Sequence, residues 1–589
     1  MSDSGSNDDP GSRLGGSGRP GMAASPAAIR RALTQSEAEG LAHLPLLADV
    51  HADVLKRLAG KAEAVELPAA DWLFRANEDA DCAYVLLTGR LEVIQDGKLV
   101  NQLTRGAVLG ELALLTSAPR SASVRARRDS TLLRLAREDF EAIAAVEPSM
   151  MRAVAAGLAA QLQQHPSRPL IPAPPSVIAV VAVDDAARAT PVGARLVQAI
   201  ARHLRVLDPG RVDANGLGRA ERDWDRVVVT AERHDGQWRD FCLRCADRVV
   251  LVAGGPSPPS GGAVHPAETG ADLVLDGDVS RSQLAAWHDA YAPRSSCVLR
   301  GTAGLASGLL SLGARVSGRS IGLTLGGGGA RAFAHIGVLE ELDSRGIQVD
   351  RVSGTSMGAL IGALHARGLG ADAIHAEVYE AFVRRNPLSD YTVPRQSLSR
   401  GRKTMRELER SFGGELIEEL AKEFRCVSVD LLRRTPVLHA RGRVVDAVAA
   451  SLRLPGLFAP YPLNGSLHID GGVLDNLPVG ALRTGEGPII AVSIPSAITR
   501  DAHGPQGAAP QIPRLVETLL RVMMLSSENA AEAARADADL VITPDTSGFG
   551  LLDFRRIDLI REAGRAATRA ALASPGSEEA LGRGSAQPM

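Results

Sequence analysis

The sequence predicts a multidomain protein with a β-rich N-terminal domain, an α/β middle segment and an α/β C-terminal domain. A chain of 589 residues is too long for one ordinary domain, because single hydrophobic cores stop growing at about 250–300 residues. Short strand patterns with turn signals are concentrated before residue 165, whereas strand and helix patterns alternate from residue 176 onward. The first arrangement is typical of hairpins and the second of parallel sheets.

The N-terminal domain is predicted to span residues 29–165. It follows residues 1–28, which are mainly Gly, Ser, Asp and Pro and are predicted to be a disordered tail. Two strands joined by a tight turn are expected at 84–87 and 89–94, and Asp96-Gly97 marks the next hairpin. The proline-rich residues 166–175 are the predicted linker.

The middle segment, residues 176–300, contains apolar runs at 177–183, 226–230 and 248–253 with helical patterns between them. Such runs predict strands of a parallel sheet that is buried on both faces. No lysine occurs between Lys98 and Lys403, which excludes the lysine of a phosphate-binding P-loop. This segment is expected to be a non-catalytic spacer, as the family resemblance of the domain pairing described below implies.

The C-terminal domain is predicted to have its core at residues 318–495, followed by a loop at 496–510 and a helical extension with a disordered tail at 511–589. A strand at 320–325 runs into four glycines, and a second strand runs into Gly354-Thr355-Ser356-Met357-Gly358. A G-x-S-x-G sequence between a strand and a helix is typical of an elbow that exposes a nucleophilic serine.

Each of these two motifs has a less specific interpretation. G-x-S-x-G occurs by chance, and a glycine run is often a flexible loop or a phosphate cradle. Their occurrence together, each between a strand and a helix, favours a hydrolase in which the glycine loop donates backbone amides to an oxyanion. The predicted oxyanion-hole residues are Gly327, Gly328, Gly329 and Arg331.

Asp470 is the predicted general base for Ser356. It ends an alternating strand pattern and precedes Gly471-Gly472, so it is expected at a strand tip, where burial would raise the pKa of its carboxyl group. The alternative role for such an aspartate is capping a turn. A Ser-Asp-His triad would need a histidine after Asp470, where only His503 occurs, in a loop-like segment. His335 and His468 are predicted to be packed or surface residues.

The three motifs together resemble the patatin-like phospholipases. The resemblance rests on Gly327 to Arg331, the elbow at Ser356, the segment 450–460 and Asp470-Gly471-Gly472. It implies a three-layer α/β fold and catalysis by a Ser356–Asp470 dyad without histidine. The apolar residues expected to line an acyl channel are Phe382, Tyr391, Leu454, Leu457, Phe458 and Tyr461.

Residues 109–123 resemble the phosphate-binding cassette of cyclic-nucleotide-binding domains, which implies a β-roll fold for the N-terminal domain. The resemblance implies that Arg120 and the start of a short helix hold the cyclic phosphate, while Glu111 accepts from the ribose. Alternatively, Glu111 and Arg120 form an internal ion pair and the cassette is structural. The predicted nucleotide-binding residues are Gly110, Glu111, Arg120 and Ser121, with cyclic AMP as the expected regulator.

The pairing of these domains resembles the neuropathy target esterase group and implies hydrolysis of a lipid acyl ester, either a lysophospholipid or a phospholipid. Two alternatives remain: a cyclic-nucleotide-responsive signalling protein with a vestigial hydrolase, and an esterase or thioesterase for other substrates. No cofactor or metal is expected for catalysis, and Cys242-x-x-Cys245 is interpreted as packing.

Composition limits the partners and the location. A net charge of −2 argues against nucleic-acid binding, and five cysteines without a paired framework favour a reducing compartment. The sequence has neither a signal-peptide pattern nor an apolar run that could span a bilayer. We therefore expect a cytoplasmic protein with peripheral contact to the inner membrane face. The oligomeric state does not follow from the sequence.

Overall fold

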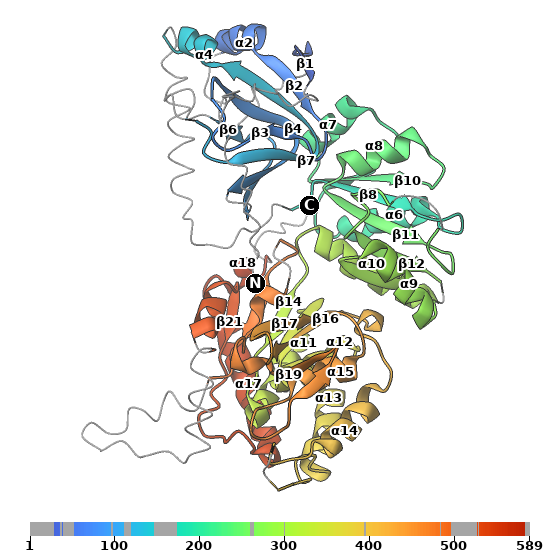
Figure 1. Cartoon of the computed structure of the whole chain (residues 1–589), viewed down its shortest axis with the longest axis vertical. Helices are drawn as coiled ribbons and strands as arrows, with labels where there is room; N and C mark the ends of the chain where they lie inside the picture. Colours follow the sequence, from blue (N-terminus) through green and yellow to red (C-terminus); the bar gives the residue numbers. More distant parts are fainter. Residues whose placement is uncertain are drawn as a thin grey trace, which may run out of the picture. The chain divides into compact units, whose positions relative to one another are not determined.

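A computed structural model describes residues 29–35, 38, 52–95, 98–110, 119–145, 174–259, 264–277, 279–299, 301–393, 396–482, 485–495, 527 and 529–582. The chain divides into two units, Met1–Ala160 and Gln161–Met589. Figure 1 shows the elements of both units, which are described separately below.

The first unit is a β-roll made of one antiparallel sheet with strand order β1-β2-β7-β4-β5, in which β3 pairs with β7 and β6 with β4. Helices α2 (Ala52–Lys61) and α4 (Arg137–Ala144) accompany the sheet. The strands are β1 (Ile29–Ala32), β2 (Glu63–Leu67), β3 (Trp72–Phe74), β4 (Cys82–Gln95), β5 (Lys98–Leu103), β6 (Val108–Leu109) and β7 (Ser123–Ala136).

One local prediction for this unit is wrong. Residues 84–94 form part of a single long strand, β4, rather than two strands joined by a tight turn. The pairing of β4 with β7 shifts its register around Thr88 and Arg90, and Gly89 between them has a φ of 104°. A glycine at positive φ permits an irregularity inside a strand, which gave the sequence the appearance of a turn.

The second unit begins with a six-stranded parallel sheet of order β13-β12-β11-β8-β10-β9. Alternate residues of β8 (Val177–Ala182) enter two different hydrophobic clusters, so both faces of the sheet are buried, as the apolar runs predicted. The remaining strands are β9 (Val206–Leu207), β10 (Arg226–Ala231), β11 (Arg248–Ala253), β12 (Asp272–Asp276) and β13 (Ser295–Leu299).

In the described part of this segment, five helices cover the sheet, and the last of them lies beyond the predicted end at residue 300. Leu309, Leu312 and Val316 of α10 belong to the same cluster as one face of β8, so the middle segment extends to Val316. The helices are α6 (Ala189–Ile200), α7 (Ala214–Asp223), α8 (Gln237–Cys245), α9 (Arg281–Tyr291) and α10 (Gly301–Val316).

The edge of the middle sheet where α/β folds usually bind ligands is occupied by the chain's own carboxylates. Glu232 accepts hydrogen bonds from the amides of Ala189 and Thr190 at the start of α6, at 3.0 Å each. A phosphate would use such helix-terminal amides. Asp184 accepts from four further amides, those of Ala186, Ala187, Gly254 and Gly255. These contacts favour the interpretation of the segment as a spacer.

Buried ion pairs connect the middle sheet to the C-terminal domain within the second unit. Glu486 accepts from Arg248 at 2.9 Å and from Arg315 at 3.1 Å, and all three side chains are buried. Burial raises the pKa of Glu486, but the two guanidinium groups outweigh this effect and hold it well below its usual range. Glu486 lies in the turn before β20, next to the hydrolase sheet.

The C-terminal domain contains an eight-stranded mixed sheet of order β18-β19-β16-β15-β14-β20-β21, with β17 paired to β16. The parallel strands are β14 (Gly322–Leu325), β15 (Arg351–Thr355), β16 (Glu423–Asp430), β20 (Ile489–Val492) and β21 (Leu540–Ile542). The antiparallel strands are β17 (Thr435–His439), β18 (Tyr461–Leu463) and β19 (Ser466–Asp470).

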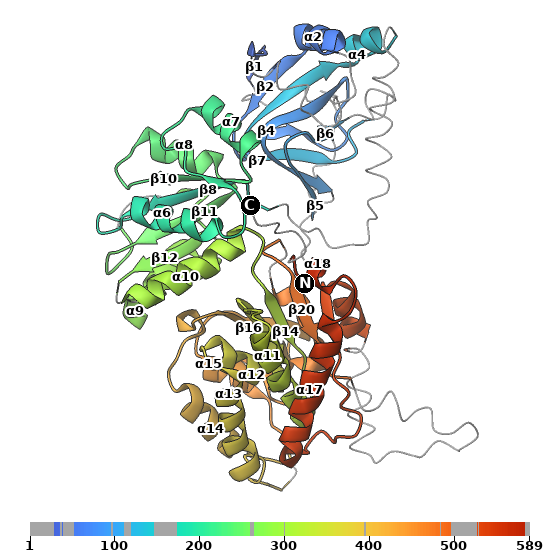
Figure 2. The same cartoon turned by 180° about the vertical axis from the view of Figure 1, so that it is seen from behind.

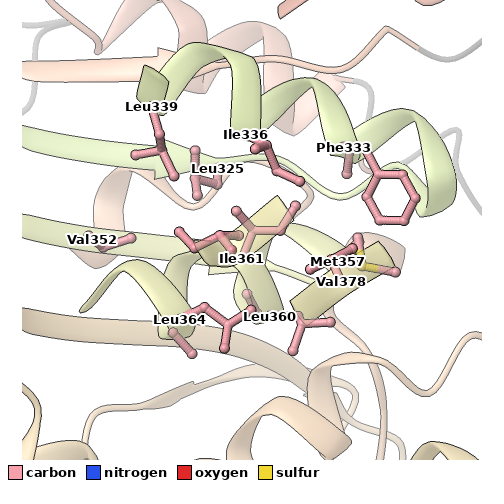
Figure 3. Packing of buried hydrophobic residues seen from close by; sticks show 14 of the residues in the cluster. Leu325, Phe333, Ile336, Leu339, Val352, Met357, Leu360, Ile361, Leu364 and Val378 are labelled. Atoms are coloured by element: carbon pink, nitrogen blue, oxygen red, sulfur yellow. The ribbon is translucent and has the colours of Figure 1, made fainter. Parts of the chain in front are cut away.

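Side chains from strands and helices form the main core of this domain. Figure 3 shows Leu325 and Val352 of the strands packed with Ile336 of α11 (Ala334–Ser344) and Ile361 of α12 (Met357–Ala366). Alternate residues of β20 belong to this cluster and to a second one that includes Leu477 and Leu482. Both faces of the sheet are therefore covered, as expected for a three-layer arrangement.

The sequence predicted that residues 511–589 are a helical extension of the hydrolase domain. Their described part belongs to that domain, but it contains a strand as well as helices. It adds strand β21 to the edge of the sheet beside β20, and α17 (Ile557–Leu572) packs against α11 (Figure 2). A strand of three residues is too short to show a periodic pattern, which is why the sequence did not reveal it. Within the described ranges, no helix combines the length and the apolar character needed to cross a bilayer.

Candidate active site

Ser356 occupies a sharp turn between β15 and α12. Its φ of 57° lies in the left-handed region, which is uncommon for a residue with a side chain and indicates a backbone held by its surroundings. Gly358 makes the turn sterically feasible, because a Cβ atom there would lie 2.3 Å from the carbonyl oxygen of Leu325. This is the strand–elbow–helix geometry that the G-x-S-x-G sequence predicted.

Asp470 lies at the end of β19 and contacts Ser356 directly. Ser356 Oγ donates a hydrogen bond to Asp470 Oδ2 at 2.6 Å, and the amide of Gly472 donates to Asp470 Oδ1 at 2.8 Å. The two residues meet because β16 lies between β15 and β19 and pairs with both strands.

The environment of Asp470 suits a general base. Its exposed fraction is 2%, and burial raises the pKa of its carboxyl group to about 6, despite the opposing hydrogen bonds from Ser356 and Gly472. A carboxylate with this pKa is ionised at neutral pH and can still accept a proton readily. Asp470 thus also caps a turn through Gly472, so the structural role and the contact with Ser356 coexist.

Ser451, at the end of α15 (Val444–Ser451), supports the elbow from behind. The amide of Ser356 donates to Ser451 Oγ at 2.8 Å, and Ser451 Oγ donates to the carbonyl of Val427 at 2.7 Å. The Ser451 side chain is completely buried. Sequence analysis placed this serine in a motif but gave it no role, although a single hydroxyl at the end of an apolar helix was a usable signal.

The glycine loop between β14 and the 3₁₀ turn Gly329–Phe333 provides fewer free amides than predicted. The Gly327 amide donates to the carbonyl of Asn476 at 3.2 Å, and the Arg331 amide donates to the carbonyl of Gly328 at 3.2 Å. Among the described residues, the amides of Gly328 and Gly329 have no hydrogen-bond partner. These two groups are the candidate oxyanion donors.

Gly327 and Arg331, the two other predicted oxyanion-hole residues, make packing and bracing contacts in the loop. Gly327 lies against the serine, since a Cβ atom on Gly327 would be 3.2 Å from that of Ser356. The Arg331 guanidinium is buried and donates to the carbonyl of Pro495 at 2.9 Å, so it braces the loop from within. Sequence analysis did not reveal either partner, because Asn476 and Pro495 are distant in the chain.

An apolar pocket opens above Ser356 and Asp470. Four of the six residues predicted for an acyl channel line it, namely Phe382, Leu454, Leu457 and Phe458. The other two do not: Tyr461 donates its hydroxyl to Asp446 at 2.7 Å, and Tyr391 is exposed to solvent. Further apolar lining comes from Met357, Leu388, Leu452, Ile494, Leu551, Leu552 and Phe554.

The candidate histidines have partners away from the dyad. His335 is buried and donates Nε2–H to the carbonyl of Gly326 at 2.7 Å, and burial lowers its pKa to about 4. His468 Nδ1 lies 2.8 Å from Ser428 Oγ, and His503 lies outside the described residues. Among the residues that the structure describes, Ser356 and Asp470 make no hydrogen bond to a histidine.

In the N-terminal unit, the Arg120 side chain is buried. It donates to the carbonyl of Cys82 at 2.9 Å and to that of Gly110 at 3.4 Å, and its guanidinium stacks on Phe74 at 4.2 Å. Among the described residues, Arg120 Nε has no hydrogen-bond partner, and no carboxylate lies within ion-pair distance of the guanidinium. Ser121 follows in the turn before β7, and Glu111 lies outside the described residues, so the predicted Glu111–Arg120 contact is untested.

Comparisons with known protein families agree with the description of the C-terminal hydrolase domain and of the N-terminal unit. Residues 323–483 match the family of patatin-like phospholipases, and residues 64–146 match the cyclic nucleotide-binding domain. The chain therefore carries a lipid ester hydrolase domain of the patatin type and a domain of the cyclic-nucleotide-binding type.

Two relatives are similar to most of this chain. An uncharacterized NTE family protein of Mycobacterium tuberculosis is 35% identical over 573 residues, covering 90% of this chain and 96% of that protein. Lysophospholipase nte1 of Aspergillus terreus is 26% identical, over 85% of this chain but only 41% of the fungal protein. The chain belongs to the NTE family.

Proposed function

We propose that the chain hydrolyses the carboxylic esters of lipids, with lysophospholipids as the first candidate substrates. The observation that carries this proposal is the 2.6 Å hydrogen bond from Ser356 Oγ to the buried Asp470 carboxylate, at the base of an apolar pocket. The fungal relative is named a lysophospholipase, and this supports the choice of substrate.

In the acylation step, Ser356 Oγ attacks the ester carbonyl carbon while Asp470 takes the hydroxyl proton. The carbonyl oxygen becomes an oxyanion that the amides of Gly328 and Gly329 can stabilise, because both are otherwise without partners among the described residues. When the intermediate collapses, the bond to the leaving oxygen breaks, and that oxygen takes the proton from Asp470. The acyl group remains on Ser356.

In the second step, water attacks the acyl-serine and Asp470 again acts as the base, so the fatty acid leaves and Ser356 regains its proton. This sequence of steps uses no histidine, because Asp470, whose pKa burial raises, takes the serine proton in each step and holds it until the leaving oxygen accepts it. The apolar pocket lining would hold the acyl chain close to Ser356.

The test is a substrate panel with one acyl chain throughout: lysophosphatidylcholine, phosphatidylcholine, monoacylglycerol and acyl-CoA. The full chain is compared with Ser356→Ala, which exchanges one small side chain for another and should leave the fold intact. Hydrolysis of lysophosphatidylcholine above the other substrates, absent from Ser356→Ala, is the expected result. Preference for acyl-CoA or monoacylglycerol would identify a different esterase, and no hydrolysis above Ser356→Ala would refute the proposal.

We also propose that the N-terminal unit binds a cyclic nucleotide, with cyclic AMP as the first candidate, and that binding regulates the hydrolase. The supporting observation is the buried Arg120 guanidinium, which has carbonyl and aromatic contacts but no carboxylate within ion-pair distance among the described residues. A cyclic phosphate would neutralise this charge. Regulation requires that the nucleotide bind two arrangements of the protein with different affinities.

A further inference from the structure

Two of the most exposed apolar side chains in the described part of the chain lie two residues apart. Val393 is 77% exposed and Tyr391 is 71% exposed, and Leu398 nearby is 41% exposed. Scattered exposed apolar residues are normal on protein surfaces, but a cluster on one short segment calls for an explanation. We refer to Tyr391, Val393 and Leu398 together as the apolar tip.

The backbone around the apolar tip is held in place by hydrogen bonds. The amide of Thr392 donates to the carbonyl of Leu398 at 3.0 Å, and the amide of Leu398 donates to the carbonyl of Gly456 at 2.9 Å. Next to it, Ser399 donates its amide to the carbonyl of Leu457 at 2.9 Å. Leu398, and Thr392 between the two other exposed side chains, thus have defined backbone partners.

The apolar tip lies close to residues that line the active-site pocket. Leu388 and Thr404, which flank the tip in the chain, both line the pocket, and so does Leu457, which is bonded to Ser399. Leu552 also lines the pocket while remaining exposed, so the pocket lining reaches the surface at this residue. A lipid that reached the tip would be close to other residues of the same lining.

Positive charge follows the apolar tip in the chain. Arg400, Arg402 and Arg406 are exposed, the last two at the start of α14 (Arg402–Phe412). Among the described residues, none of the three forms an ion pair with a carboxylate. Two acidic residues close in the chain have other partners: Asp390 accepts from the Ser399 hydroxyl and the Lys403 amide, and Glu407 pairs with Arg385 and Arg410.

We propose that the apolar tip, which lies close to residues of the active-site pocket, is a membrane-docking surface that inserts into the interfacial layer of an anionic phospholipid bilayer. Apolar and aromatic side chains that insert beside basic residues are the combination that binds anionic lipid surfaces. The purpose assigned to docking, delivery of a lipid ester to Ser356, rests on the proposed function. The docking itself does not depend on catalysis.

The test is flotation of the full chain with vesicles of phosphatidylcholine alone or of phosphatidylcholine and phosphatidylglycerol in equal parts. Val393→Asp and Tyr391→Asp change exposed side chains outside the catalytic machinery, so folding should be unaffected. The matched control is Ile29→Asp, which replaces a side chain that is 62% exposed in the N-terminal unit. Hydrolysis of a soluble short-chain ester is measured alongside for every variant.

We expect the wild-type chain to float with the anionic vesicles and to bind phosphatidylcholine vesicles more weakly. Val393→Asp and Tyr391→Asp should each reduce binding by about tenfold or more, because each replaces an inserted apolar group by a charge. The control variant should bind like the wild type, and all four proteins should cleave the soluble ester equally. Vesicle-bound lysophospholipid should be cleaved more slowly by the two tip variants.

Equal binding by wild type and Val393→Asp would overturn the proposal, and so would equal binding to neutral and anionic vesicles. A wild-type chain that stays with the vesicle-free fraction would also overturn it and would point to a protein partner for the tip. The two proposals fail separately. Flotation without any ester hydrolysis would refute the proposed function alone, whereas hydrolysis of the soluble ester without flotation would refute the docking surface alone.

Discussion

Replacing Asp470 by Asn should make the protein inactive and more stable at the same time. The two side chains have nearly the same shape. Asn can accept from the Gly472 amide through its carbonyl oxygen and donate from its NH₂ group to Ser356 Oγ, so both contacts of Asp470 can be retained. The amide cannot take the serine proton, and ester hydrolysis should fall by roughly 10² or more.

The gain in stability follows from the pKa of Asp470. Burial raises that pKa from 3.8 to about 6, so the folded state binds the proton more tightly than the unfolded state. Stability therefore falls as the pH rises from about 4 to about 6, and the full penalty is present above that range. A shift of about two units corresponds to about 3 kcal/mol, which Asp470→Asn should recover at pH 8.

The assay is urea unfolding of both proteins at several pH values, with the exposed Asp276→Asn as a control. We expect the free energy of unfolding of Asp470→Asn to exceed that of the wild type at pH 8 by up to about 3 kcal/mol. The difference should shrink toward pH 4, while the control shows none. A variant that is less stable than the wild type at pH 8, or a difference that is independent of pH, would refute the reasoning about the buried carboxylate.

Three further changes test other parts of the structure. Ser451→Ala leaves the Ser356 amide without its buried acceptor, which costs about 1–3 kcal/mol. We therefore expect kcat to fall about tenfold or more with KM unchanged, and the kcat of Ser451→Cys to lie between those of the wild type and Ser451→Ala. A change in KM alone would contradict the positioning role. Arg120→Ala should weaken cyclic AMP binding about ten- to a hundredfold in calorimetry on the full chain, whereas no heat from the wild type at millimolar nucleotide would make the cassette structural. Glu486→Ala removes the carboxylate that Arg248 and Arg315 share, although Asp272 still pairs with Arg248 and Glu423 with Arg315. The free energy of unfolding should fall by up to about 3 kcal/mol, and an unchanged urea midpoint would show that Glu486 contributes little to the ion cluster.

The sequence predicted those features that depend on local backbone geometry. Ser356 could be placed at an elbow because the flanking glycines and the change from strand to helix are visible within a few residues. Asp470 could be placed at a strand tip by the alternation before it and the two glycines after it. The domain types could be predicted in the same way, because the strand patterns of the two halves differ.

The features that escaped prediction depend on contacts between distant parts of the chain. The capture of the Gly327 amide by Asn476 and the support of the elbow by Ser451 require the folded sheet to bring these residues together. Tyr461 has an apolar ring and was assigned to the pocket, but its hydroxyl is satisfied by Asp446. The strand β21 is stabilised by its pairing with β20 and not by its own short sequence.

Covalent labelling tests the central claim, that Ser356 is the nucleophile and Asp470 its base, most directly. The full chain is treated with a fluorophosphonate, and the modified residue is located by mass spectrometry of its peptides. We predict a single adduct on Ser356, formed much more slowly in Asp470→Asn and absent from Ser356→Ala although Ser451 is still present. An adduct on another serine, or labelling of Ser356→Ala at the wild-type rate, would contradict the account.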